Sequence, residues 1–425
     1  MATTGCAASP QGSHWPAVGV VLGAGIVTAF HAGKVAIATP MLQRDPGIDL
    51  AAAGWLAGIF AILGCLGGIP AGSLAGRAGD RPSLIAGLAL TALGAVIGAT
   101  ASGYGVLLVS RILEGGGFLL ITVAGPAILN RIARPGQQDI VLALWSCFMP
   151  AGLALAMFTG PLPGDWRLLW WGGAGLGAAL ILAVRAVIPP APTRARPSWR
   201  PMLSDALQVV GSTKTRLAAS CFALYSLMFF ALFSFLPVLL MTRMGLSHST
   251  AGWLSALAMI MNIIGNLTAG WLLMRGIRRA ALLSGACLIM GLSSLGIFLP
   301  VFDDIPTVLL CLLFAGVGGL IPAALISAGP TLTPSAPLMP LGIGLLMQGS
   351  NLGQLAGPVA VGSAVEAWGW PAAAGVVAGS ALIAILIARR IGVDDSQPAR
   401  PAMPSDPGVR PRRSPPTPRS PRTRS

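Results

Sequence analysis

Long apolar segments dominate this 425-residue chain and limit what it can fold into. Apolar residues make up 54% of the sequence and charged residues only 9%, whereas a soluble domain carries roughly a quarter charged residues. A helix needs about 20 apolar residues to cross a bilayer. Twelve runs near that length lie at about 16–40, 51–73, 83–102, 104–130, 138–160, 166–188, 216–241, 250–274, 280–300, 305–330, 338–362 and 368–389. The sequence therefore predicts an all-α membrane protein with twelve transmembrane helices.

A short motif occurs twice and indicates that the chain is built from two similar halves. Residues 72–81 read GSLAGRAGDR, and residues 270–279, 198 positions later, read GWLLMRGIRR. The tripeptide Gly-Trp-Leu at 54–56 recurs at 252–254 with the same offset. Two landmarks with one offset predict an internal duplication, and hence two six-helix bundles.

The remaining segments have compositions unlike the bundles. Residues 189–214 are rich in Pro and Arg and predict a cytoplasmic linker, with a short surface helix near 202–211. The C-terminal stretch is rich in Pro, Arg and Ser and has too few large apolar side chains to bury a core. Its arginines either stay solvated or contact anionic lipid headgroups. The predicted organisation is an N-terminal cytoplasmic segment at 1–15, a bundle at 16–188, the linker at 189–214, a second bundle at 215–390 and a disordered basic tail at 391–425.

Loop charges predict the orientation of the helices. With both termini in the cytoplasm, most Lys and Arg residues fall in cytoplasmic loops, and only Arg44, Arg167 and Arg243 fall in outer loops. Such an excess is the usual mark of the cytoplasmic side. The first fifteen residues contain no Lys or Arg, so no cleavable signal peptide is expected. The bias toward Ala, Gly and Arg is typical of bacteria with GC-rich genomes, which predicts the cell inner membrane.

Composition also argues against several other classes of partner. The formal net charge is +14, but the basic residues do not cluster on a soluble segment that could fold, so no nucleic acid is expected. The six cysteines lie mostly inside apolar runs without the spacing of a metal site. We expect a monomer in a lipid bilayer that acts on a small-molecule substrate and needs no metal or cofactor.

Four ionisable side chains lie deep inside predicted spans. His31 and Lys34 occur in the first span, and Arg111 and Glu114 occur in the fourth. The members of each pair are three residues apart and so share a helix face. A charge at the centre of a membrane helix costs about 2.5–3.5 kcal/mol, and such residues usually mark a substrate or proton path. The four residues are therefore the first candidates for a functional site.

Structural explanations for these residues stay open. Lys34 and Arg111 are both close enough to the outer surface for their side chains to snorkel toward it. Arg111 and Glu114 could form a pair that only holds their helix to its neighbours. His31 could be a packing residue.

The second half offers neutral polar residues instead of charges. Gln348, Asn351 and Gln354 lie in one span, and Tyr225 lies in another. Helix packing is the default use of such groups in lipid. The functional alternative is a hydrogen-bonding wall opposite the charges, in which Tyr225, Gln348 and Asn351 contact the substrate.

Two motifs resemble those of the major facilitator superfamily of transporters. The stretch Gly72–Arg81 is similar to that family's loop motif G-x-L-a-D-r-x-G-r-r, except that Gly76 replaces the acidic residue, which Asp80 could partly replace. The stretch from Arg111 to Gly117 resembles its fourth-helix motif R-x-x-x-G-x-G. The resemblance implies that the first and fourth helices line a central cavity. It also implies a conformational role for the loop motif residues Gly72, Arg77, Gly79, Asp80 and Arg81.

A narrower resemblance points to the cyanate permease branch of that family. It rests on Gly33-Lys34-Val35 followed by Pro40, and on the stretch 111–115, which reads RILEG. This likeness implies a small inorganic anion as the substrate.

The charges of the four candidate residues predict an anionic substrate. Lys34 and Arg111 give two positive charges against the single negative charge of Glu114. Donors in a positive field of low dielectric favour an anion. We therefore expect a secondary transporter of small anions, such as cyanate-like ions or carboxylates, working by alternating access of the two bundles. Glu114 is the candidate for carrying a coupling proton, as in a symporter.

The sequence leaves one alternative transport function open and disfavours several other classes of protein. Proton-driven efflux of apolar or aromatic compounds is the alternative, although the G-P-x-x-G-G signature of many antiporters is absent from residues 145–152, which read WSCFMPAG. A sensor is disfavoured because the tail offers no folded output domain. An enzyme is disfavoured because no Ser-His-Asp or metal-ligand cluster is apparent. The chain also lacks a G-x-x-x-x-G-K-[ST] phosphate loop.

Overall fold

The computed structural model describes residues 15–44, 48–67, 79–134, 137–190, 199–335 and 338–395. Every regular element in these ranges is a helix. The first half contains α1 (Trp15–Arg44), α2 (Leu50–Gly58), η1 (Ile59–Ala61), α4 (Asp80–Ala99), α5 (Tyr104–Ile132), α6 (Gln138–Ser146), α7 (Phe148–Thr159) and α8 (Trp166–Val187). The rest contains α9 (Trp199–Gly211), α10 (Thr213–Phe233), α11 (Leu236–Met244), α12 (His248–Met274), α13 (Arg279–Phe298), α14 (Asp304–Gly318), α15 (Leu320–Ile326), α16 (Gly329–Leu332), α17 (Met339–Trp368) and α18 (Trp370–Asp395).

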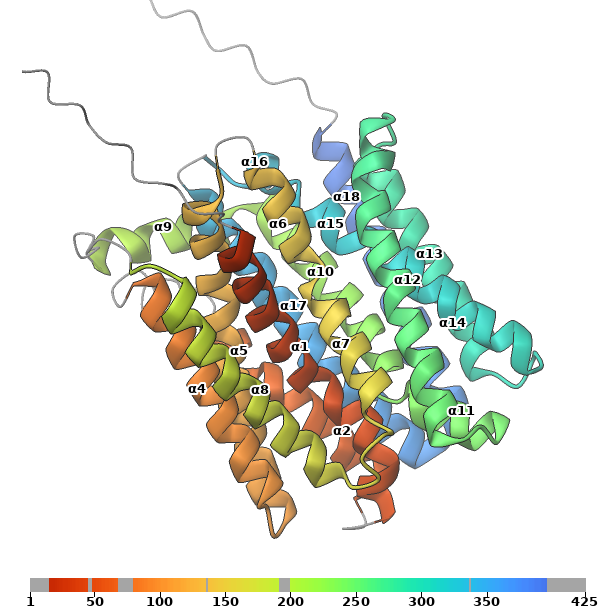
Figure 1. Ribbon diagram of the computed structural model, residues 1–425. Helices are drawn as coiled ribbons and strands as arrows, with labels where there is room; N and C mark the ends of the chain where they lie inside the picture. Colours follow the sequence, from red (N-terminus) through yellow and green to blue (C-terminus); the bar gives the residue numbers. More distant parts are fainter. Residues whose placement is uncertain are drawn as a thin grey trace, which may run out of the picture.

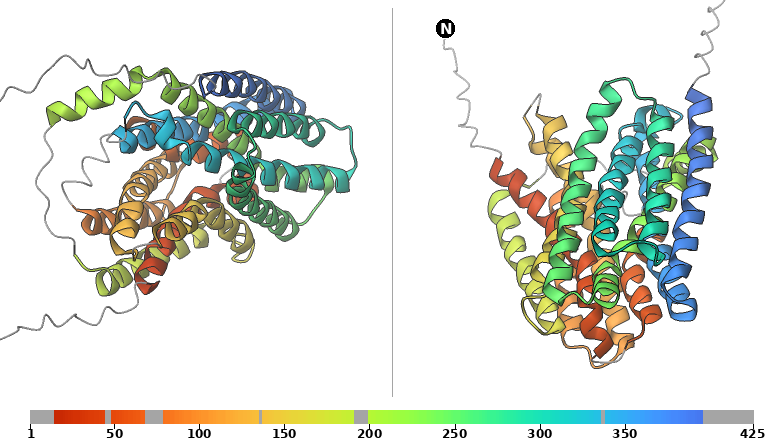
Figure 2. Two further views of the ribbon diagram at one scale, coloured as in Figure 1. Left: turned by 90° about the horizontal axis from the view of Figure 1, so that it is seen from above. Right: turned by 90° about the vertical axis from the view of Figure 1, so that its right-hand side faces the viewer.

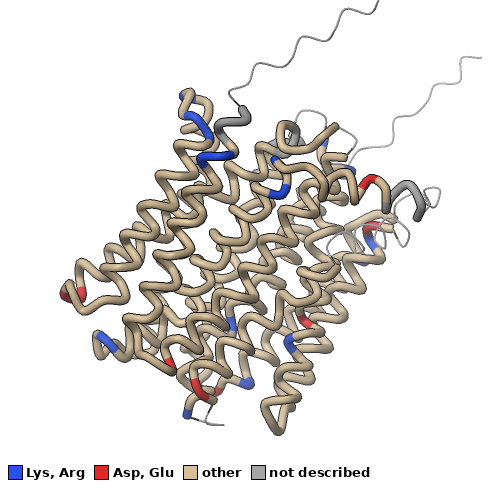
Figure 3. Tube along the Cα trace, turned by 180° about the vertical axis from the view of Figure 1, so that it is seen from behind, with Lys and Arg blue, Asp and Glu red and all other residues tan. Residues whose placement is uncertain are grey.

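Ten helices in the described ranges are long and apolar enough to cross a membrane. The number rises to eleven if the bent pair α6 and α7, which meet at 42°, is one span. The remaining predicted run, at 338–362, corresponds to α17, a helix of 30 residues whose polar residues lower its mean hydropathy. The all-helical membrane fold predicted from the sequence is therefore present. Figure 3 shows why it suits a membrane, because most of the charged positions lie near the two ends of the helices and only a few lie between them.

Helix α1 occupies the middle of the first half. It packs against α5, α7 and α8, while α4 packs against α5 and α8 (Figure 1). Small residues permit these contacts, as expected where helices associate in lipid. A Cβ atom on Gly33 would lie only 2.9 Å from Leu153 Cδ2 of α7. The first half thus surrounds α1, which carries two of the four ionisable candidates.

The second half is arranged around α10. This helix packs against α17 and α18, α13 packs against α18, and α12 packs against α14 (Figure 2). Helix α9, where the sequence predicts a surface helix, contacts α10 and α17. Helix α18 continues to Asp395, past the predicted start of the basic tail, and residues 396–425 lie outside the described residues.

The two halves meet along α2 with α17 and along α7 with α12. We call the end of the helices that holds the α4–α5 turn, at residues 100–103, the far end, and the end where α1 begins the termini end. Two hydrogen bonds join the halves at the far end. His248 Nε2 donates to the carbonyl of Ile37 at 2.7 Å, and the Leu50 amide donates to Glu366 Oε2 at 3.3 Å. Contact between the halves is thus reinforced at the far end.

A matched pair of glycines on α5 tests the helix packing. A Cβ on Gly115 would overlap the carbonyl oxygen of Phe60, whereas Gly105 has no atom within 4 Å of that position. We expect Gly115→Ala to lower the free energy of unfolding by about 1–3 kcal/mol, because a backbone carbonyl cannot give way cheaply. Gly105→Ala should be neutral or slightly stabilising, because Ala is the better helix former by about 1 kcal/mol. Thermal unfolding of both variants in detergent measures the difference, and equal melting temperatures would contradict this packing.

Candidate functional site

Helices α1 and α5 bring the four predicted ionisable residues together. His31 and Lys34 lie on α1, and Arg111 and Glu114 lie on α5. All four side chains are fully buried, with 0% of their surface exposed. The spacing of three residues within each pair places both members on the face that meets the other helix. We call these four residues the buried quartet.

The carboxylate of Glu114 lies at the centre of the quartet. Lys34 Nζ donates to Oε1 of Glu114, and Arg111 Nη1 donates to Oε2. His31 Nδ1 lies 3.2 Å from the same Oε1 and 3.0 Å from Lys34 Nζ. Each carboxylate oxygen is therefore bound by a different cation, one from each helix.

Arg111 also binds the backbone of two other segments. Its Nη1 donates to the carbonyl of His31 at 2.8 Å, and its Nε donates to the carbonyl of Leu56 on α2 at 3.2 Å. Its guanidinium lies 4.6 Å from the centre of the Phe60 ring. The Arg111 side chain on α5 thus connects this helix to α1 and α2 through hydrogen bonds to backbone carbonyls.

An aromatic ring from α8 covers the other cation. Lys34 Nζ lies 4.2 Å from the centre of the Trp170 ring, a cation–π contact. Trp170 and Phe60 were not among the residues singled out from the sequence. Aromatic residues within apolar runs are usually packing residues, so no local signal distinguished them.

Glycines on α4 and α8 make room for the quartet. A Cβ on Gly173 would lie 2.5 Å from His31 Cε1, and a Cβ on Gly94 would lie 2.8 Å from Glu114 Cγ. The neighbouring backbones therefore approach the ionisable side chains closely. Substituents at either glycine would displace a member of the quartet.

The structure excludes one of the open explanations for these residues. Lys34 and Arg111 do not snorkel, because both are fully buried and bound to Glu114. The ion pair of Arg111 with Glu114 exists, but it is part of a network that includes Lys34. Within the quartet, two nitrogen atoms have no hydrogen-bond partner among the described residues, namely Nη2 of Arg111 and Nε2 of His31. The quartet therefore keeps unused hydrogen-bonding capacity in the membrane interior.

The candidate residues of the second half lie on α10 and α17. Tyr225 is buried among aromatic rings, with ring centres 6.0 Å from Phe222 and 5.8 Å from Phe229. Asn351 Nδ2 donates to the carbonyl of Met347 at 2.8 Å, within α17. Gln348 lies half-buried on the same helix. No hydrogen bond or ion pair within the described residues joins these three side chains to the quartet.

The loop motif is only partly within the described residues. Gly72 and Arg77 lie outside them. Gly79 precedes α4 with a φ of 88°, a conformation that favours glycine. Asp80 accepts from Arg131 of α5, with 2.7 Å between Oδ2 and Nε and 3.1 Å between Oδ1 and Nη2. Asp80 thus forms a bidentate pair with Arg131 within the first half.

Arg81, the last residue of the motif, contacts α8. Its Nη2 donates to the carbonyl of Arg185 at 2.8 Å. The described part of the motif therefore connects α4 to α5 through Asp80 and to α8 through Arg81.

The quartet predicts an order of stability for three variants. Glu114→Gln leaves two buried cations without a counter-charge and should destabilise by about 3–5 kcal/mol. Lys34→Met leaves the pair of Arg111 with Glu114 intact and should cost less. The double variant keeps one unpaired cation and should recover part of the loss caused by Glu114→Gln alone. Thermal unfolding in detergent gives the order, and a double variant less stable than Glu114→Gln would contradict the network.

Comparison with known proteins gives similar sequences and folds. The chain is 26% identical to the tetracenomycin C resistance and export protein of Streptomyces glaucescens, over 47% of this chain and 37% of that protein. It is 27% identical to the plastidic glucose transporter 4 of Arabidopsis thaliana, over 44% of this chain and 35% of that protein. The chain thus spans little more than a third of the length of these curated relatives. A solved nucleoside transporter, NupG, superposes with a TM-score of 0.72 at 16% identity, covering 88% of this chain and 99% of that one.

The family itself follows from a match over nearly the whole chain. The sequence model of the Major Facilitator Superfamily matches residues 21–336 and 218–422. This match agrees with the helical membrane fold and with the two motifs. It does not extend to the cyanate permease branch, so that narrower likeness stays a prediction. The chain belongs to the Major Facilitator Superfamily, a family of transporters.

Proposed function

We propose that this transporter moves a small anion together with a proton, and that the buried quartet carries both. One observation carries the proposal, namely the carboxylate of Glu114 bound between Lys34 and Arg111 with no exposed surface. Charged residues inside a membrane protein usually serve a substrate or proton path. Membership of a transporter family supplies the reaction, which is movement of a solute across the bilayer.

The coupling follows from the charges of the quartet. Protonation of Glu114 removes the only negative charge that faces Lys34 and Arg111 within the quartet. An uncompensated buried charge costs about 3–5 kcal/mol. Arrival of the proton alone is therefore unfavourable, and an anion that arrives with it restores the balance. Each ligand thus favours the binding of the other.

The geometry also suggests where the anion binds. The two oxygens of Glu114 mark positions that a substrate carboxylate would take once Glu114 is protonated and moves aside. Trp170 and Phe60 hold the cations through their rings, and this leaves N–H groups available to the substrate. Arg111 Nη2, which has no partner among the described residues, adds a further donor. Charge-assisted bonds to such donors are the strong ones.

Transport requires that the quartet open to solvent. We propose that the halves rock about the contacts of α2 with α17 and of α7 with α12. The bonds made by His248 and Glu366 at the far end would break when that end opens. The loop charges support a location in the cell inner membrane with both termini in the cytoplasm.

Export of aromatic or apolar compounds is the second candidate. Similarity to a protein named for tetracenomycin C resistance and export favours it. A row of buried aromatic rings on α10 also favours it, since Phe222, Tyr225, Phe229 and Phe233 form successive ring contacts. Such a row could stack against a flat substrate. If the protein exports such compounds in exchange for protons, the quartet would still carry the proton.

Uptake by proteoliposomes tests the coupling. Labelled small carboxylates and cyanate-like ions are offered with and without an inward proton gradient. We expect the gradient to stimulate wild-type uptake roughly 5–150-fold, the range of typical coupling free energies. Glu114→Gln should lose this stimulation, because it cannot accept the proton. Asp304→Asn, which alters an exposed acidic residue at the far end, is the matched control and should behave like the wild type.

The same vesicles separate the two candidate functions. Anion uptake that needs Lys34, Arg111 and Glu114 supports the first. Extrusion of aromatic compounds in exchange for protons, without anion uptake, would reject the first and support export. If the proton gradient still stimulates transport by Glu114→Gln, Glu114 does not carry the coupling proton under either candidate function.

A further inference from the structure

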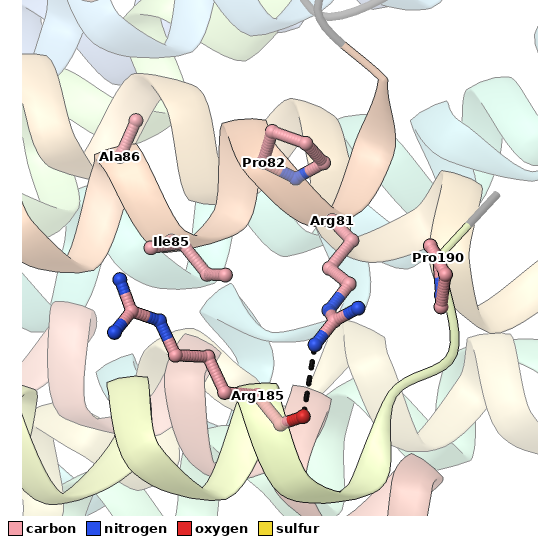
Figure 4. Close-up of a pocket in the computed structure, with 6 residues that line it drawn as sticks. All are labelled: Arg81, Pro82, Ile85, Ala86, Arg185 and Pro190. Atoms are coloured by element: carbon pink, nitrogen blue, oxygen red, sulfur yellow. Dashed lines mark hydrogen bonds between the residues drawn. The ribbon is translucent and has the colours of Figure 1, made fainter. Parts of the chain in front are cut away.

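A crevice lies between α4 and α8 at the termini end, away from the buried quartet. It is lined by Arg81, Pro82, Ile85, Ala86, Arg185 and Pro190 and has a volume of about 540 Å³ (Figure 4). Two arginines therefore border a space whose other walls are apolar. No acidic side chain is among the lining residues.

The two arginines keep unused hydrogen-bonding capacity. Arg81 Nη2 donates to the backbone carbonyl of Arg185, and the buried Nε of Arg81 has no partner among the described residues. Asp80, the acidic residue next to it, directs both carboxylate oxygens to Arg131. The guanidinium of Arg185 is exposed and lies beside Ile85 (Figure 4). Two positive charges facing one space without a carboxylate favour an anion there.

The surroundings of the crevice indicate that the anion is attached to a lipid. Large apolar side chains stay exposed further along the same two helices, with 53% of Leu93 on α4 and 67% of Leu182 on α8 accessible. In a protein that spans a membrane, exposed residues of this kind meet acyl chains. The crevice thus combines positive charge at a helix end with apolar surface that leads into the bilayer.

We propose that this crevice binds an anionic phospholipid, with Arg81 and Arg185 on its phosphate and its acyl chains along α4 and α8. The forked donors of arginine match phosphate oxygens. Basic pockets between transmembrane helices are recognised sites for anionic headgroups. The loop charges place this site in the cytoplasmic leaflet. The bound lipid would bridge α4 and α8 next to the Asp80–Arg131 pair, and the proposal does not depend on the substrate.

Native mass spectrometry of the purified full-length protein tests the site. The protein is titrated in detergent with phosphatidylglycerol or with phosphatidylcholine of the same acyl chains, and bound lipid is counted. We expect preferential retention of phosphatidylglycerol. Arg185→Gln should weaken it about tenfold, the effect of losing one charge-assisted contact. Arg390→Gln, an exposed arginine on α18 outside the crevice, is the matched control and should retain the lipid as the wild type does.

Further measurements in the same experiment distinguish the lipid from other ligands. Equal retention of phosphatidylcholine would show an apolar groove without headgroup selection and would overturn the proposal. Displacement of phosphatidylglycerol by millimolar inorganic phosphate would show a site for free anions and would overturn the lipid assignment. Arg81→Gln should repeat the loss seen in Arg185→Gln. If Arg81→Gln does not fold, Arg185→Gln still decides, because it keeps the backbone carbonyl that Arg81 binds.

Discussion

The bond between one carboxylate and two cations in an apolar interior is the interaction on which this structure depends. Glu114 satisfies Lys34 and Arg111 at once, and neither cation has another acidic partner among the described residues. Burying such charges singly would cost several kcal/mol each. The close approach of α1 and α5, and the glycines on α4 and α8 that face the quartet, all serve to keep these three groups together.

The sequence was most informative where its pattern is local. Long apolar runs predicted the helices, and the spacing of three residues predicted that His31 and Lys34, and likewise Arg111 and Glu114, share a face. That the two pairs lie against each other was implied only by the family resemblance, because contacts between distant helices leave no mark on spacing. The partners Trp170 and Phe60 could not be predicted for the same reason. The polar residues of α17 show a second limit of the sequence. The polarity of Asn351 suggested a contact with the substrate, but its side-chain amide donates to the carbonyl of Met347 in its own helix.

The two halves have diverged in charge while keeping their common architecture. The repeated motif places Arg77 opposite Arg275 and Arg81 opposite Arg279 in the duplication, but the buried quartet has no counterpart in the second half. The corresponding interior is filled by rings on α10 and by Asn262, which binds the carbonyl of Ala315. The buried charges therefore belong to one half, and the corresponding interior of the other half is largely neutral.

The confinement of the quartet to a single half has an electrical consequence. Lys34, Arg111 and Glu114 together carry one net positive charge, and they move as one unit because both of their helices belong to the same half. Loading a proton and a monovalent anion leaves that charge at one. The membrane voltage then acts equally on the loaded and the empty protein, so it does no net work over a full cycle. Under the proposed function, the driving force is the difference in pH and in anion concentration across the bilayer, and transport proceeds without generating a current.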